Sequence, residues 1–417
     1  MKNKCKKWMA ILLCMVMAFT MLGTSCQVPN PDEGQNTPPS SSSTPTPGNG
    51  GTTPPPSGDN GGEYVPTIIS TPSNSQVVNL LDGDILEYCS NYSLYKSEEY
   101  LPENYSATNP YRENAYAPKP VTLSWQSEGE AQYYTIKVAT NKNLVDAMTY
   151  ITLDTSLELC DLFSGTNYYY QIIASYADKT VKSQIFTFKT ANLMRTIELE
   201  GVSNTRDIGG YYTVDGNRIR QGLVYRGGRL DDITEAAKQK ALNVYGIKTV
   251  LSVRGDVSTP LGNSVNFVGV SGPFYFSGTN PNAIVSTGST INSTLYRQAL
   301  LTEIRTFAKA ENYPIYVHCS LGRDRTGTLA FLINALCGVG EKDLYMDFEA
   351  TFFSEIGCYD GTLPSGLVRH DFQNLYTCMS NYSTGTLAEN VAKFMLDLGV
   401  TQTEINTIRS IMIEEVA

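Results

Sequence analysis

The sequence predicts a multidomain chain, in which an all-β sandwich is followed by an α/β domain with a central, mainly parallel sheet flanked by helices. Three observations predict this fold class. The chain has 417 residues, more than one compact core usually takes. Between about residues 121 and 190, apolar and polar residues alternate as in half-buried strands. From about residue 196, short β-like runs are followed by segments with apolar residues at helical spacing.

Residues 1–25 have the pattern of a secretory signal peptide. Four lysines lead, an apolar run over residues 8–22 follows, and small residues end the segment. The run is short for a membrane span. Its ending, LGTSC, resembles a bacterial lipoprotein signal in which Cys26 becomes the lipidated first residue, although Gly23 stands where an aliphatic residue is more usual. We therefore expect an exported protein, anchored through a lipid on Cys26 to the outer face of a bacterial cell membrane. An ordinary cleaved signal and an uncleaved anchor remain open.

Residues 26–63 are predicted to form a disordered tether. The segment consists largely of Pro, Ser, Thr and Gly and has almost no apolar side chains. It cannot bury enough surface to offset its conformational entropy. Such a composition is typical of an extended stalk between an anchor and a folded domain.

The charge of the chain argues against nucleic acid as a partner. Without residues 1–25, 27 basic residues stand against 41 acidic ones. A body this acidic has no general attraction for nucleic acid or anionic lipid. Any anion that it binds must be held by a local site.

The β-rich part is assigned to residues 64–192, of which residues 64–116 are uncertain. VTLSW, YYTIKVAT and SQIFTFKT alternate as strands do, with turn residues at sandwich-like spacing. Residues 162–168, LFSGTNY, resemble the fibronectin type III pattern of Leu, two residues, Gly-Thr, one residue and Tyr. Trp125 matches the early core tryptophan of that family. The resemblance implies a spacer or a binding platform, and we identify no ligand site in it.

The α/β part is assigned to residues 196–417 and contains a strand, a tight loop and a helix in succession. LYRQALLTEIRTFAKA has apolar residues at helical spacing, and Pro314 cannot continue that helix. IYV then reads as a buried strand, and TGTLAFLINALCG as an apolar helix that a glycine ends. In this arrangement, main-chain NH groups converge on an anion at the helix N-terminus.

The loop between this strand and helix carries residues suited to phosphate chemistry. Cys319 is followed six places later by Arg325, and no other cysteine of the chain has that spacing. The five residues between them can wrap amides around phosphate oxygens, and the arginine closes the cradle as a two-pronged donor. The amides, the helix dipole and Arg325 would all stabilise a nucleophilic thiolate. Thr326 can donate its hydroxyl to the sulfur, and Gly322 permits a close backbone approach.

These residues, HCSLGRDRTG, resemble the signature of the cysteine-based protein tyrosine phosphatases. The match is closest to the bacterial tyrosine and dual-specificity branch, whose loop reads His-Cys, two residues, Gly-Lys-Asp-Arg-Thr-Gly. Four further blocks resemble the same branch: VSNTRDIGGYYTVDGNRIRQGLVYRGGRL, GIKTVLSVRG, EKDLYMDFEATFF and LGVTQTEINTIRSIMIEE. Together they cover about residues 196–417.

The resemblance implies the following roles. Cys319 would be the nucleophile, and Arg325 would bind phosphate and stabilise the transition state. The amides of the cradle would come from Ser320, Leu321, Gly322, Arg323, Asp324 and Arg325. The only tryptophans, Trp8 and Trp125, lie outside this domain, so the Trp-Pro-Asp loop of many relatives is absent in its usual form. We therefore expect Asp324 to be the general acid, with another carboxylate such as Asp256 as the alternative.

Further residues of the resembling blocks are expected to support the loop. His318 is predicted to be a buried histidine that hydrogen-bonds to backbone, and Arg254 to brace the loop. Asn204, Arg206, Asp207 and Arg226 are assigned similar supporting roles. The only other histidine is His370, so no histidine-based metal site is available. We expect no metal and no other cofactor.

The sequence thus predicts an exported phosphomonoester phosphatase, with phosphotyrosine proteins as the first choice of substrate. A phosphoinositide or inositol phosphate phosphatase with the same mechanism is an alternative. Arg323 favours it, because the lysine at this position is associated with phosphoinositide dephosphorylation in the family. A catalytically silent surface-binding protein is a third possibility, although Cys319, Arg325 and Thr326 are intact. The segment from Val257 to Thr290 is expected to form a lid.

Overall fold

The structure is a computed structural model that describes residues 68–91, 117–127, 129–271, 293–354 and 367–416. The predicted signal peptide, the tether and Cys26 lie outside the described residues, and so does most of the expected lid. The side chain of His370 is not described either. Within the described ranges, no helix combines the length and the apolar character that crossing a membrane requires.

The N-terminal region is made of two β-sheets. A three-stranded sheet has the order β1-β3-β6, and a larger sheet has the order β2-β9-β7-β4-β5, with β8 paired to β7. The strands are β1 (Ile69–Thr71), β2 (Gln76–Val78), β3 (Val121–Gln126), β4 (Tyr133–Ala139), β5 (Met148–Thr152), β6 (Ser156–Leu159), β7 (Asn167–Ser175), β8 (Thr180–Lys182) and β9 (Phe186–Thr190). The strands expected from the alternation at 121–125, 133–140 and 183–190 are confirmed.

Alternating residues of both sheets fill one hydrophobic core. In β3, Val121, Leu123 and Trp125 are buried while the residues between them are exposed. They join Ile136 of β4 and Ile172 of β7 in a single cluster. This is the arrangement that a period of two predicts for sheets with one buried face.

Helix α2 (Gly83–Asn91) belongs to the core of the C-terminal region, although its sequence position falls in the uncertain segment before β3. Ile85 and Tyr88 are fully buried in the same cluster as the helices of the C-terminal region. The Tyr88 hydroxyl donates to Glu349 Oε2 at 2.7 Å. A segment of the range 64–192 therefore completes the later domain and not the sheets that surround it in sequence.

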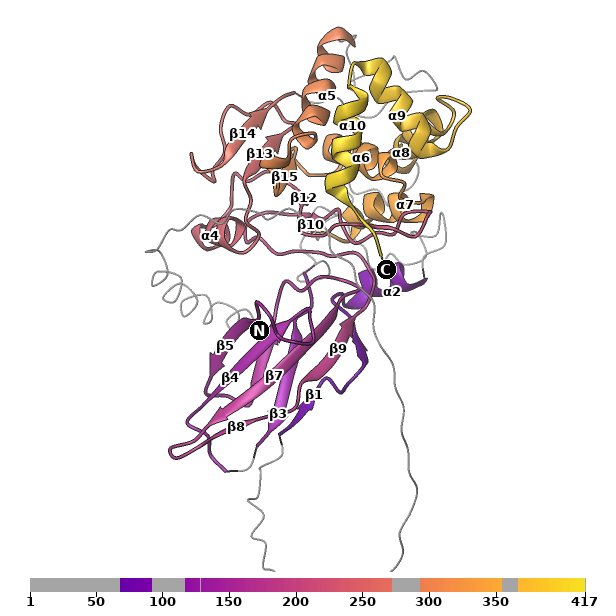
Figure 1. Cartoon of the computed structure of the whole chain (residues 1–417). Helices are drawn as coiled ribbons and strands as arrows, with labels where there is room; N and C mark the ends of the chain where they lie inside the picture. The colour runs from indigo at the N-terminus through magenta and orange to yellow at the C-terminus, as the bar shows by residue number, and fades with distance from the viewer. Residues whose placement is uncertain (1–67, 92–116, 128, 272–292, 355–366, 417) are drawn as a thin grey trace, which may run out of the picture. The chain divides into compact units, whose positions relative to one another are not determined.

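The C-terminal region is built on a five-stranded sheet with the order β10-β12-β15-β13-β14 (Figure 1). The strands are β10 (Arg206–Asp207), β12 (Val224–Gly227), β13 (Thr249–Ser252), β14 (Asn266–Gly269) and β15 (Ile315–His318). All neighbours are parallel except β10 and β12, which confirms the predicted, mainly parallel sheet. A small separate pair joins β11 (Arg218–Ile219) to β16 (Ile413–Glu414).

Helices pack around this sheet and bury an extensive apolar cluster. They are α4 (Glu235–Asn243), α5 (Ser293–Phe307), α6 (Asp324–Leu336), α7 (Glu341–Glu349), α8 (Leu367–Ser380), α9 (Leu387–Leu398) and α10 (Gln402–Met412), with the short 3-10 turns η1 (Ala310–Asn312) and η2 (Ala350–Phe353). The helix expected before Pro314 ends at Phe307, and η1 follows it.

The prediction of a lid over residues 257–290 is wrong for part of that range. Residues 266–269, inside the segment from Val257 to Thr290, form β14 at the edge of the sheet. Asn266 and Phe267 pair with Thr249 and Val250, so this stretch is held by a strand ladder. Strand β14 has only four residues. An alternation of apolar and polar residues over so short a stretch cannot be distinguished from the composition of a loop.

Candidate active site

Cys319 lies directly after β15, where the three parallel strands β12, β15 and β13 end together. All four residues of β15 are buried, and the strand sits between its two parallel neighbours. Helix α6 begins five residues later, at Asp324. The Cys319 side chain is only 3% exposed. A central strand, a tight turn and a helix N-terminus therefore surround the thiol, as the sequence predicts.

The loop offers main-chain NH groups that could hold an anion. Among the described residues, Ser320, Leu321 and Gly322 donate no hydrogen bond through their main-chain NH groups. These amides precede the first turn of α6, where the helix dipole favours negative charge. The backbone thus has the donors that a phosphate needs without any side chain being required.

Gly322 allows this loop to close tightly. Its φ of 69° lies in the left-handed region, and a Cβ at this position would lie 2.3 Å from the carbonyl carbon and oxygen of Gly227. The close backbone approach that Gly322 permits is thus to the end of β12. Any larger residue would push the loop away from β12.

Arg325 stands in the first turn of α6 and is half-buried. Its Nη1 donates to the Val253 carbonyl at 3.1 Å, just beyond β13. The Thr326 hydroxyl is fully buried and has no hydrogen-bond partner among the described residues. The expected donation from Thr326 to the sulfur of Cys319 is therefore not made in this structure.

His318 has the structural role that the sequence predicts. The ring is 4% exposed, and its Nδ1 lies 3.2 Å from the Cys319 carbonyl. Burial lowers the pKa of His318 below its ordinary value. A neutral imidazole that contacts the backbone next to the nucleophile can fix the direction in which the loop leaves the strand.

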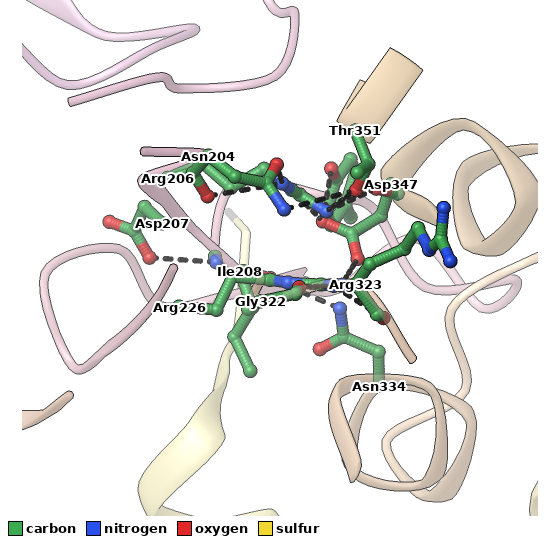
Figure 2. Close-up of polar contacts among 12 residues, drawn as sticks. Asn204, Arg206, Asp207, Ile208, Arg226, Gly322, Arg323, Asn334, Asp347 and Thr351 are labelled. Atoms are coloured by element: carbon green, nitrogen blue, oxygen red, sulfur yellow. Dashed lines mark hydrogen bonds and ion pairs between the residues drawn. The ribbon is translucent and has the colours of Figure 1, made fainter. Parts of the chain in front are cut away.

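Two side chains donate hydrogen bonds to carbonyl groups of the loop, and Figure 2 shows them as sticks. Arg226 Nη2 donates to the Gly322 carbonyl at 2.7 Å, and Asn204 Nδ2 donates to the Leu321 carbonyl at 3.0 Å. Both donors are buried. With the carbonyls turned toward these donors, the NH groups of the same peptide units are directed to the opposite side, where an anion would bind.

Asp347 of α7 links the residues that hold the loop. Its carboxylate pairs with Arg206 Nε at 3.0 Å and with Arg226 Nη1. Arg206 Nη1 in turn donates to Asn204 Oδ1 at 2.6 Å, as Figure 2 shows. Burial alone would raise the pKa of Asp347, but Arg226 and Arg206 lower it below its ordinary value. The buried Asp347 carboxylate thus fixes Arg226, which donates to the loop, and Arg206, which positions Asn204.

The bracing role predicted for Arg254 is wrong. Its side chain pairs with Asp231 at 2.9 Å and with Asp256 at 2.7 Å, and it makes no hydrogen bond to residues 319–325 within the described ranges. The backbone next to it does contact the strand end, because Val253 donates to the His318 carbonyl. A short sequence motif places a residue near a site but does not say which partner its long side chain reaches.

Asp207 also supports a different part of the fold. It pairs with Arg195 at 2.8 Å and accepts hydrogen bonds from the amides of Gly209 and Gly222. Asp207 thus orders the turn after β10, away from the loop carbonyls. Its neighbour Arg206 does act on the loop, through Asn204 and Asp347.

The two candidate general acids differ in their surroundings. Asp324 accepts from Arg323 Nε at 3.0 Å and is 19% exposed at the N-terminus of α6. Asp256 accepts from Arg254 and from the Ser252 hydroxyl at 2.6 Å. Burial would raise the pKa of Asp256, but these hydrogen bonds lower it below its ordinary value. These hydrogen bonds favour the charged form of Asp256.

Two charged residues near the site were not predicted, Asp347 and Glu303. Asp347 stands among Tyr345, Met346 and Phe348 in α7, and Glu303 stands on the apolar face of α5. Charged residues are rarely buried unless they are paired or perturbed. An acid within an otherwise apolar helical stripe is the signal that could have found both.

No group of three or more His, Cys, Asp or Glu is arranged to hold a metal ion in the part of the chain that the structure describes. The donors around Cys319 are instead backbone amides and arginines. This donor set suits an oxyanion and not a cation.

Comparison with known proteins supports this chemistry. The sequence profile of the tyrosine phosphatase family matches residues 197–414. A protein of Cupriavidus necator named "Putative tyrosine-protein phosphatase" is 27% identical over 170 residues, which is 36% of this chain and 61% of that protein. The chain thus spans less than two thirds of the length of this relative.

Two solved structures are similar at a lower level. The core catalytic domain of the PP-IP phosphatase Siw14 from S. cerevisiae, in complex with citrate, has 16% identity and a TM-score of 0.23; the match covers 31% of this chain and 70% of that chain. A second structure of the Siw14 catalytic core has 12% identity and a TM-score of 0.28, with 50% and 98% covered. A likeness this weak transfers no substrate to this protein.

Proposed function

The chain belongs to the tyrosine phosphatase family, and from this premise we propose that it hydrolyses phosphomonoesters through a cysteinyl-phosphate intermediate. The observation that carries the proposal is the placement of Cys319 at the carboxyl end of β15, with unengaged loop amides and Arg325 at the start of α6. A nucleophile, an anion cradle and a bidentate cation meet there.

The reaction proceeds in two displacements. The Cys319 thiolate attacks phosphorus, the S–P bond forms, and the ester P–O bond breaks as the leaving oxygen takes a proton from a general acid. Water then attacks the phosphocysteine, giving its proton to the same group, and the S–P bond breaks to release inorganic phosphate and the thiolate. The amides of residues 320–325 and the guanidinium of Arg325 stabilise the charge on the three equatorial oxygens.

Asp324 is the general acid in this proposal. It lies in the signature loop at the N-terminus of α6, next to Arg325. In the alternative, Asp256, hydrogen bonds from Arg254 and Ser252 lower the pKa of the carboxyl group and so favour its charged form. Binding of a substrate phosphate would compete with Asp324 for Arg323 and release its carboxyl group toward the leaving oxygen.

The charges around the loop favour a substrate that has a single phosphate group and little other charge, as in phosphotyrosine. Apart from Arg325, the described arginines at this edge are Arg229, Arg254 and Arg323. Each of them pairs with an aspartate, and the partners are Asp231, Asp232, Asp256 and Asp324. A multiply phosphorylated inositol needs cations that are not already neutralised.

In the sequence, residues 272–292 include no charged residue. Arg323 remains the feature that favours the inositol phosphate alternative, since its guanidinium could exchange Asp324 for a second phosphate. We therefore rank phosphotyrosine first and inositol phosphates second.

Export and a fibronectin-like module complete the proposal. Residues 1–26 support lipidation at Cys26, which incorporation of labelled palmitate would test, with Cys26→Ala as the control. In the N-terminal sheets, the amide of Phe163 donates to the Tyr168 hydroxyl at 2.8 Å, and Trp125 is buried. A tyrosine that binds backbone a few residues upstream is typical of such sandwiches.

The decisive experiment is hydrolysis of p-nitrophenyl phosphate by the full chain under reducing conditions, beside Cys319→Ser. We expect turnover in the parent and none in the variant, together with a trapped phosphoenzyme in the parent alone. Phosphotyrosine peptides, phosphoserine peptides and inositol phosphates then rank the substrates. A folded, reduced parent that is as inactive as Cys319→Ser would refute the enzymatic function and favour a phosphate-binding surface protein.

A further inference from the structure

Residues 161–164, in the loop between β6 and β7, are held by side chains from outside the N-terminal sheets. Arg195 Nη2 donates to the Asp161 carbonyl at 2.7 Å, and Arg195 Nε donates to the Leu162 carbonyl at 3.0 Å. The same guanidinium group lies over the Phe163 ring, 4.5 Å from its centroid. Arg195 is only 3% exposed. One buried arginine thus contacts three successive residues of the loop.

Arg195 also connects this loop to the central sheet of the C-terminal region. Its Nη1 pairs with Asp207 of β10 at 2.8 Å. Only residues 191–194 separate Arg195 from the end of β9, and Met194 is buried in the core cluster of the C-terminal region. The two regions are therefore joined by a short segment that is itself packed.

Two more side chains bind the backbone of Ser164, which is 1% exposed. The Gln221 side-chain amide donates to the Ser164 carbonyl at 3.0 Å and accepts from the Ser164 NH at 2.9 Å. Arg218 of β11 donates to the same carbonyl at 2.5 Å. A pair of hydrogen bonds to one residue fixes its orientation as well as its distance. The loop is thus held in one orientation on this surface.

Asp161 adds a charged contact with α4 and the residue that lies just beyond it. Asp161 Oδ2 pairs with Lys240 Nζ at 3.0 Å, and Oδ1 accepts from the Tyr245 hydroxyl at 2.6 Å. The side chains of the ion pair are largely shielded from solvent. Removing one partner of a shielded ion pair is more costly than removing one partner of an exposed pair, because the other charge is left uncompensated.

We propose that residues 161–164 are a docking segment that fixes the N-terminal sheets on the C-terminal region. The surface that binds this segment consists of Arg195, Arg218, Gln221, Lys240 and Tyr245. Domains joined in one chain usually move relative to each other, because the interfaces between them are small and polar. Here the contacts are buried and charge-assisted, so the two regions unfold as one cooperative unit and the N-terminal sheets are not a freely moving spacer.

Two probes follow the two regions separately during urea denaturation of the full chain. Trp125 is buried in the core of the N-terminal sheets, and in a Trp8→Phe background it is the only tryptophan of the chain. Cys337 is buried in the core of the C-terminal region, so pulsed alkylation of its thiol, measured by peptide mass spectrometry, reports unfolding there. We expect Trp125 fluorescence and Cys337 alkylation to have the same urea midpoint, as in a single transition.

Variants on either side of the docking contact should shift both probes. Asp161→Asn removes the charge and keeps a side chain that suits the φ of 61° at this position. We expect it to lower the midpoint of Cys337 alkylation as much as that of Trp125 fluorescence. Lys240→Gln, on the opposite side, should also lower both. The shift in the double variant should be smaller than the sum of the two single shifts, because both single variants remove the same ion pair.

The matched controls make the same substitutions away from the contact. Asp146 lies in the loop between β4 and β5, is exposed, has a φ of 53° and forms no ion pair with a described residue. Lys238 is on the same helix as Lys240 and pairs with the exposed Glu235. Asp146→Asn and Lys238→Gln should leave both midpoints unchanged.

Different midpoints for Trp125 and Cys337 in the parent overturn the proposal, even if a docking variant does not fold. A shift of one probe alone in Asp161→Asn or in Lys240→Gln overturns it as well. None of these measurements depends on turnover. A parent that is inactive but has coincident, jointly shifting midpoints refutes the proposed function and leaves this inference standing.

Discussion

Replacing Asp347 by asparagine removes the negative charge that pairs with both Arg206 and Arg226. Arg206 and Arg226 have side chains that are 0% exposed, and Asp347 is 6% exposed. Asparagine keeps the shape but leaves both guanidinium groups buried with one anion fewer. Removing one partner of a buried ion pair costs about 3–5 kcal/mol. We expect a loss of that size in the free energy of unfolding, measured by urea denaturation.

The same change should lower activity, because Arg226 would no longer be fixed while it donates to the Gly322 carbonyl. A displacement of about 1 Å in a catalytic group can cost about 100-fold in rate. We expect kcat/KM on p-nitrophenyl phosphate to fall between about tenfold and about 100-fold under conditions where the variant is fully folded.

The pH dependence of this stability difference has a definite sign. The pKa of Asp347 is lowered in the folded state, so its contribution is present above the ordinary aspartate pKa of 3.8. It is lost as the pH falls through the folded-state pKa. The difference between the parent and Asp347→Asn should therefore be largest at neutral pH and shrink in acid.

Asp207→Asn is the matched control. Asp207 is also fully buried and pairs with an arginine, Arg195. Arg195 donates no hydrogen bond to the described residues 319–325. Asp207→Asn should lose a similar amount of stability with a smaller loss of kcat/KM. The reasoning is refuted if Asp347→Asn unfolds at the same urea concentration as the parent, or if both variants lose activity equally.

Three further predictions concern single side chains. Asp324→Asn should lower the rate on phenyl phosphate, a poor leaving group, far more than on p-nitrophenyl phosphate; equal losses would assign proton donation to another group. Burial raises the pKa of Glu303 from 4.5 to about 8, so its contribution to stability is complete below pH 4.5 and is lost as the pH rises through about 8. Relative to the parent, Glu303→Gln should therefore gain up to roughly 4–5 kcal/mol between pH 4.5 and pH 9 in urea denaturation, and a constant difference would contradict this. Tyr88→Phe leaves the buried Glu349 without its 2.7 Å hydrogen bond and should cost about 1–3 kcal/mol, whereas an unchanged urea midpoint would show that α2 contributes little to this core.

The strand, loop and helix around Cys319 were predictable because their signals are local. The apolar run before Cys319, the glycine at 322 and the apolar helix after it are contiguous in sequence. Each follows from backbone conformation and burial within a few residues. The parallel sheet was predictable for the same reason, since short buried strands alternate with helices.

Helix α2 shows where local signals end. Its residues precede β3 in sequence, yet Ile85 and Tyr88 are buried with the catalytic-domain core. Nothing in a nine-residue amphipathic helix states which of two hydrophobic cores will cover it. Which core buries the apolar face of α2 depends on which apolar surface the folded regions leave uncovered.

The sequence by itself determined the chemistry of the site: a cysteine, an arginine six places on, and a glycine-containing loop at the start of a helix. Only the tertiary structure decided how that loop is held and tuned. Arg226 reaches Gly322 across 96 residues and Asp347 across 121, and Arg254 pairs with Asp231 and not with the loop. Such pairings depend on which buried charges the folded chain brings together, and the energy of a buried charge is set by those neighbours and not by its position in the sequence.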